Sequence, residues 1–127
     1  MPKGDMSAEQ FRREHLGQRE HKYHAKACRV DGIAFPSRKE ANRYGELRLL
    51  ERGGHIRNLE VDAQKAIVYP IEVNGIHVTS YRPDFRYWHV EQGREVLEDV
   101  KGFVTDVFRL KKKLMRAVYG VEIIELR

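Results

Sequence analysis

Two segments with helical spacing, each with its own start and stop signal, bracket a stretch of short extended runs. The first begins at a capping box, with Ser37 as the N-cap and Glu40 three residues later. Apolar side chains then recur at three-residue steps until Gly53 ends the pattern. This spacing predicts an amphipathic helix over 38–52.

The second helical segment lies near the end of the printed sequence. Thr105 or Asp106 can cap it, and Tyr119-Gly120 stops it. The apolar spacing predicts a buried face made of Val107, Leu110, Leu114 and Val118. Four basic side chains are expected to turn toward solvent or a partner: Lys111, Lys112, Lys113 and Arg116.

Short extended runs separated by turn signals fill the stretch between the two helices. Asn74-Gly75 is the preferred pair for a tight hairpin turn, so the runs on either side of it are expected to pair. Further turns are expected at 91–94 and at Gly102. The predicted strands cover 63–73, 76–80, 81–90, 95–101 and, after the second helix, 121–126.

The predicted order of elements is helix, three or four strands, helix and strand. A hairpin meander crossed by a helix and followed by a further strand gives an α/β sandwich with a mixed sheet. The length of 127 residues fits one domain, which we place at 27–127. Residues 1–26 form a basic N-terminal arm, a candidate for mobility or for dimer contact.

Charge is distributed unevenly along the chain. Residues 61–100 carry four basic and seven acidic side chains, whereas residues 101–127 carry seven basic and three acidic ones. An acidic centre between basic ends favours a protein that binds a polyanion around a site for cations. The plainer interpretation is an ordinary soluble protein with uneven charge.

The apolar residues are too scattered for a membrane protein. No run approaches the ~20 apolar residues of a membrane span, and the first residues show no secretory signal. The single cysteine, Cys28, excludes an internal disulfide and fits a reducing compartment. The sequence therefore predicts no membrane contact and a cytoplasmic location.

The residues with the clearest chemical meaning are Asp84, Asp99 and Lys101. Asp99 and Lys101 share a strand face, and antiparallel pairing with the preceding strand would bring Asp84 beside them. Two acids on neighbouring strands suit Mg²⁺, and a nearby lysine can orient or deprotonate a water. Such a set can hydrolyse a phosphodiester bond. The alternative is a strand-edge ion pair and an unrelated Pro-Asp turn.

The stretches around these residues resemble the signature of the PD-(D/E)XK nuclease superfamily. The likeness is carried by Tyr81-Arg82-Pro83-Asp84-Phe85 and by Glu98-Asp99-Val100-Lys101-Gly102. Stretches at 22–23, 31–41 and 47–54 are similar to small, mostly phage-encoded proteins of that superfamily, relatives of the phage endonuclease I type of Holliday-junction resolvase. The resemblance covers about residues 22–126.

The resemblance implies a restriction-endonuclease-like sandwich with an αβββαβ core, and it implies roles for single residues. Asp84 and Asp99 would bind Mg²⁺ or Mn²⁺, with the Val100 backbone carbonyl as a further ligand, and Lys101 would be the catalytic lysine. Glu40 matches an acid that reaches the metal directly or through water, although the capping box also accounts for it.

Two further positions are ambiguous. Gln64 lies where several members of the family carry a glutamine that points at the site, but a lone polar residue on a strand is more often an ordinary hydrogen-bonding group. Glu98 neighbours Asp99 and points to the opposite face, so the spacing to Lys101 selects Asp99. Aspartate is less usual there than glutamate, which leaves the metal preference open.

Basic side chains near the acids are candidates for DNA contact. Lys111, Lys112, Lys113 and Arg116 follow the site as a cluster that could contact backbone phosphates, or they form a solvated helix face. Arg82 and Arg86 flank Asp84 on its strand face. They would contact the scissile phosphate or pair with acids.

Together these features predict a DNA endonuclease in which a metal-activated water attacks the phosphorus in line. The resemblance implies a product with a 5′-phosphate. The expected substrate is double-stranded or branched DNA, above all a four-way junction formed in recombination. Symmetric resolution needs two active sites, so a homodimer is expected, in the host cytoplasm if the protein is phage-encoded. The alternatives are an exonuclease or nickase on the same fold and a non-catalytic DNA-binding module.

Overall fold

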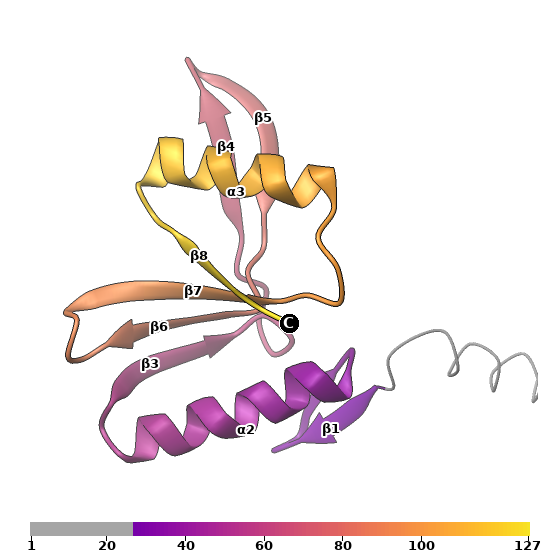
Figure 1. Cartoon of the computed structure of the whole chain (residues 1–127), viewed down its shortest axis with the longest axis vertical. Coiled ribbons are helices and arrows are strands. Elements are labelled where there is room, and N and C mark those ends of the chain that lie inside the picture. The colour runs from indigo at the N-terminus through magenta and orange to yellow at the C-terminus, as the bar shows by residue number, and fades with distance from the viewer. Residues whose placement is uncertain (1–26) are drawn as a thin grey trace, which may run out of the picture.

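A four-stranded sheet with a helix on each side forms the centre of the molecule (Figure 1). The computed structural model describes residues 27–127, and the predicted N-terminal arm lies outside them. The elements are β1 (Cys28–Val30), β2 (Ile33–Phe35), α2 (Arg38–Arg52), β3 (Ile56–Val61), β4 (Tyr69–Val73), β5 (Ile76–Tyr81), β6 (Phe85–His89), β7 (Arg94–Val100), α3 (Asp106–Tyr119) and β8 (Ile123–Leu126).

The central sheet is mixed, as the sequence predicts. Its strand order is β3-β6-β7-β8, with antiparallel pairing from β3 to β7 and parallel pairing of β8 with β7. β4 and β5 form a separate hairpin that stands away from the sheet (Figure 1). The hairpin turns at Asn74 and Gly75, whose positive φ angles of 52° and 79° are those that this pair tolerates.

Helix α2 has the predicted bounds and the predicted cap. The Ser37 hydroxyl accepts a hydrogen bond from the Glu40 N–H at 3.1 Å. Its apolar stripe is buried at Ala41, Tyr44 and Leu47, and it packs on the face of the sheet that carries Phe85, Tyr87 and Val96. Burying such a stripe stabilises a helix far more than its intrinsic propensity does.

Helix α3 also starts and ends as predicted, but its predicted buried face is wrong. Val107, Leu110 and Val118 are 63%, 58% and 40% exposed, whereas Phe108 and Met115 pack against Leu97 of the sheet. The two stripes lie about 100° apart on a helix, and sequence spacing supports either of them. The larger Phe108 and Met115 side chains take the side that faces the sheet. Neither described helix is long and apolar enough to cross a membrane.

Three of the predicted strands have a boundary that is wrong by two residues or more, and β1, β2 and β3 lie outside the predicted strands. The run from Ala63 becomes a strand only at Tyr69, and before it the Asp62 carboxylate accepts a hydrogen bond from the Ile67 N–H at 2.8 Å. The run predicted over 81–90 is divided at 82–84, where Pro83 stands between the end of β5 at Tyr81 and the start of β6 at Phe85. The last strand begins at Ile123 and not at 121.

Candidate active site

Two aspartates meet where β6 begins and β7 ends. β6 and β7 are antiparallel and pair Phe85 with Glu98, so the residues just outside that pair, Asp84 and Asp99, become neighbours. The Asp84 carboxylate accepts a hydrogen bond from the Val100 N–H at 2.7 Å, which fixes it against β7. The structure thus brings together the two acids that the sequence singles out.

Both carboxylate oxygens of Asp99 have partners from the described chain. The Lys101 Nζ atom lies 3.2 Å from Oδ1, and the Tyr81 hydroxyl donates to Oδ2 at 2.5 Å. The Lys101 ammonium group also lies 4.3 Å from the centroid of the Phe108 ring, a cation–π contact. Lys101 is therefore held at the acids from two sides. The role of Tyr81 was missed, although the residue stands within the motif.

Glu40 on α2 is the third acid of the group. Its backbone N–H serves the Ser37 cap, while its side chain is buried among other acids. Burial, followed by the negative charges of Asp84, Asp62 and Asp99, raises the pKa of Glu40 to about 7. Glu40 can therefore take part in both, because its backbone N–H belongs to the helix cap and its carboxyl group lies among the other acids.

Asp62 is a fourth acid, which sequence analysis missed. Pairing of Val61 with Phe85 brings the end of β3 beside Asp84, and the Asp62 N–H donates to the Asp84 carbonyl at 3.0 Å. Its carboxylate binds the Arg82 guanidinium at 2.7 Å. No sequence signal marks it, since a residue 22 positions from Asp84 becomes a neighbour only through strand pairing.

Glu98 lies on the other face of the sheet, as predicted, within an ion-pair network. It is fully buried and accepts two hydrogen bonds from Arg43, at 2.8 and 2.7 Å. The Tyr87 hydroxyl donates to the same carboxylate at 2.5 Å. This network connects α2 to the middle of the sheet and does not touch the acids around Asp99.

The remaining sequence candidates occupy other positions. Arg82 lies between β5 and β6, so its predicted place on the Asp84 strand face is wrong, and it pairs with Asp62. Arg86 is on β6 and binds Glu60. Gln64 is exposed in the turn after β3, so its predicted place on a strand is also wrong.

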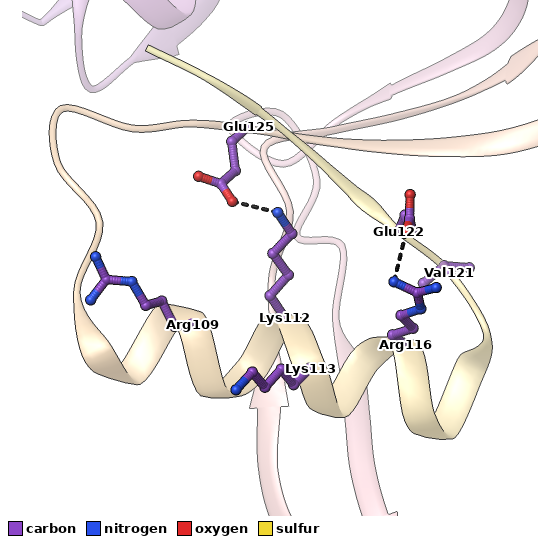
Figure 2. Close-up of a pocket in the computed structure, with 7 residues that line it drawn as sticks. All are labelled: Arg109, Lys112, Lys113, Arg116, Val121, Glu122 and Glu125. Carbon is purple, nitrogen blue, oxygen red and sulfur yellow. Dashed lines mark hydrogen bonds and ion pairs between the residues drawn. The ribbon is translucent and has the colours of Figure 1, made fainter.

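The basic candidates on α3 border a hollow between that helix and β8 (Figure 2). Lys112, Lys113 and Arg116 line it together with Arg109, which the sequence analysis did not include. Lys111 is half-buried and is not among the lining residues. The hollow has a volume of about 300 Å³.

The acid group, which consists of Glu40, Asp62, Asp84 and Asp99, suits a divalent metal that takes water and substrate oxygens as further ligands. Within residues 27–127, no group of three His, Cys, Asp or Glu side chains is arranged to hold an ion alone. Mg²⁺ needs only one or two protein carboxylates. Burial raises the pKa of Asp84, as do the charge of Asp99 and hydrogen bonding with it. Crowded carboxylates of this kind are a fitting donor set for a cation.

The acid group predicts that the metal-free protein loses stability as the pH rises. In the folded chain Glu40 keeps its proton up to about pH 7, against an ordinary value of 4.5, so the folded state binds more protons. The free energy of unfolding in EDTA should therefore fall between about pH 4.5 and 7, by roughly 2–3 kcal/mol. Urea denaturation across that range measures it.

Glu40→Gln is the matched variant for this prediction. It removes the titrating group with little change in shape, so its unfolding free energy should fall less over the same pH range. Mg²⁺ should reduce the loss in the wild type, since an ion bound only by the folded state stabilises it. Identical pH profiles for the two proteins would contradict the prediction.

Comparison with protein families gives a match over most of the chain. A family model described as "Protein of unknown function (DUF1064)" matches residues 20–124, which is most of the chain. No curated protein and no solved structure matches the chain.

Proposed function

The chain belongs to the DUF1064 family of proteins of unknown function, and we propose that it is a metal-dependent DNA endonuclease. The observation that carries the proposal is the set of Asp84, Asp99 and Lys101 on neighbouring strands, with Glu40 beside them on α2. A carboxylate pair next to a lysine suits hydrolysis of a phosphodiester.

The topology supports a restriction-endonuclease-like fold for this proposal. With the β4–β5 hairpin regarded as an insertion, the elements follow the order α2, β3, β6, β7, α3 and β8. That order is the αβββαβ core that the superfamily resemblance implies. The acids lie at the start of the second core strand and the end of the third.

Metal binding and orientation of the attacking water are assigned to different side chains. Asp84 and Asp99 would hold Mg²⁺ or Mn²⁺, with the Val100 carbonyl as a further ligand and Glu40 reaching it directly or through water. The metal, when bound, supplies Lewis-acid activation and neutralises charge on the phosphate. Lys101, positioned by Asp99 and Phe108, orients the attacking water and offsets the charge that develops at phosphorus.

The proposed substrate is branched DNA, and a four-way junction is the first choice. A small domain that contacts backbone phosphates selects the shape of DNA more than its sequence. Resolution of a junction needs two paired cuts, so the active form is proposed to be a homodimer.

The proposal predicts paired cuts in a labelled four-way junction and slower cutting of a linear duplex of the same sequence. Cleavage should require Mg²⁺ or Mn²⁺ and should stop in EDTA. Equal cutting of both substrates would retain the nuclease and exclude the junction preference. Release of single nucleotides from ends would indicate an exonuclease.

The matched control is Asp99→Asn, which keeps the shape of the side chain and removes its charge. It should fold, bind DNA and make no cuts. Tight DNA binding by the wild type without any metal-dependent product would favour a non-catalytic binding module.

A further inference from the structure

Four basic residues lie on one side of α3. Arg109, Lys112, Lys113 and Arg116 are spaced by three, one and three residues, the spacing of a single helical stripe. Figure 2 shows these side chains along the hollow between α3 and β8, with Val121 at one end. A stripe of cations along a hollow is a surface for an extended anion.

Two of the four cations are held in place by acids of the same hollow. Lys112 binds Glu125 at 2.5 Å, and Arg116 binds Glu122 at 2.9 Å (Figure 2). Arg109 binds Asp106 at 2.9 Å, an acid outside the lining of the hollow, and Lys113 has no ion pair within the described residues 27–127. The four bases outnumber the three acids that pair with them, so the hollow keeps a positive charge after this pairing.

The hollow lies one strand away from the acid group. β8 runs parallel to β7 and pairs Glu125 with Asp99. Neighbouring strands are about 4.8 Å apart, so the Lys112–Glu125 pair stands next to the proposed metal ligand. The backbone is joined there as well, since the Lys101 N–H donates to the Leu126 carbonyl at 2.7 Å. An extended anion along the hollow would therefore pass beside Asp99.

We propose that this hollow binds backbone phosphates of one DNA strand next to the phosphate that is cut. Lys112, Arg116 and Arg109 exchange Glu125, Glu122 and Asp106 for phosphate oxygens, while Lys113 adds a further contact. The acids keep the cations extended in the free protein, so less side-chain ordering remains to be done on binding. This inference rests on the proposed nuclease function and assigns the strand contact to one surface.

The test is the salt dependence of DNA binding by Arg109→Gln/Lys113→Gln. Neither residue pairs with the two acids of the hollow, so the change leaves the Lys112 and Arg116 pairs intact. Binding is measured in EDTA, so that no strand is cut. The slope of log Kd against log salt should fall by about 2, because each lost phosphate contact removes about 0.9 for a duplex.

The matched control is Arg57→Gln/Arg94→Gln, which removes the same charge. In the sheet register Arg57 is the strand partner of Trp88 and Arg94 is the strand partner of His89. Both arginines therefore lie at the end of the strands away from Asp84. Its slope should equal that of the wild type. An unchanged slope for the hollow variant, or the same fall in the control, would overturn the proposal.

Inorganic phosphate, with the same oxygen chemistry, serves as the competing ligand. Millimolar phosphate should displace little DNA from the wild type at constant ionic strength, because a strand makes several contacts at once. Full displacement would show that the hollow takes a free phosphate and would overturn the strand contact.

The outcomes separate this inference from the proposed function. Metal-dependent cutting of the junction by the wild type, together with a weaker Kd and the lower slope for the hollow variant, supports both. Metal-dependent cutting with an unchanged slope would retain the nuclease and reject the hollow. A lower slope for the hollow variant, combined with a wild type that never cuts DNA, would reject the nuclease and retain the hollow.

Discussion

Lys101→Met is expected to slow DNA cleavage about 100- to 10,000-fold, the usual contribution of a positioned proton-transfer group. Methionine keeps the stem that packs over Phe108 and removes the ammonium group, which lies 3.2 Å from Asp99. The rate should be measured in single turnover with saturating protein, so that a change in DNA affinity does not enter.

Metal binding distinguishes the lysine from the acids. Lys101→Met should keep the rise in melting temperature that Mg²⁺ causes in the wild type, because both carboxylates remain. Asp99→Asn should lose both that rise and the cleavage. Lys101→Met protein that cleaves at the wild-type rate would reject the proposed role and leave Lys101 as a partner of Asp99 only.

Arg43→Met is expected to lower the free energy of unfolding by about 3–5 kcal/mol, the cost of a buried charge left without its partner. Glu98 has no exposed surface, and Arg43 supplies two of its hydrogen bonds. A loss of that size is a large part of the roughly 5–15 kcal/mol that stabilises a domain. Urea denaturation monitored by circular dichroism measures it.

The double variant Arg43→Met/Glu98→Met separates loss of the pair from loss of packing. Replacing both members of a buried ion pair with apolar side chains is often neutral, so most of the stability should return. The Tyr87 hydroxyl loses its acceptor in that variant, and Tyr87→Phe removes the remaining cost. Equal destabilisation by the single and double changes would show that Arg43 acts through its packing and not through Glu98.

Local signals in the sequence were sufficient for the helices and for the hairpin turn. Helix α2 runs from Arg38 to Arg52, as its cap and stripe predict, and Thr105 caps α3. These features depend on neighbours within four residues, which the chain itself specifies. The strand boundaries near Ala63 and Pro83 coincide with a side-chain bond from Asp62 and with a proline between strands.

The candidate site could be predicted only in part. Asp84, Asp99 and Lys101 could be named because two adjacent strands and one turn relate them, so their meeting follows from local pairing. Glu40 could be named through the family resemblance. Asp62 and Tyr81 were missed because no spacing rule connects them to the acids. Arg109 was missed although its helical spacing to Lys112 and Lys113 could have included it.

The sequence by itself determined where helices begin and end, where the hairpin turns, and which acids share a strand pair. The tertiary structure alone decided that Phe108 and Met115, and not Val107 and Leu110, face the sheet. It also decided that Glu40 joins the acids and that Glu125 stands beside Asp99. Helical periodicity and strand alternation fix relations within one element, whereas contacts between elements depend on how whole faces pack to bury apolar area.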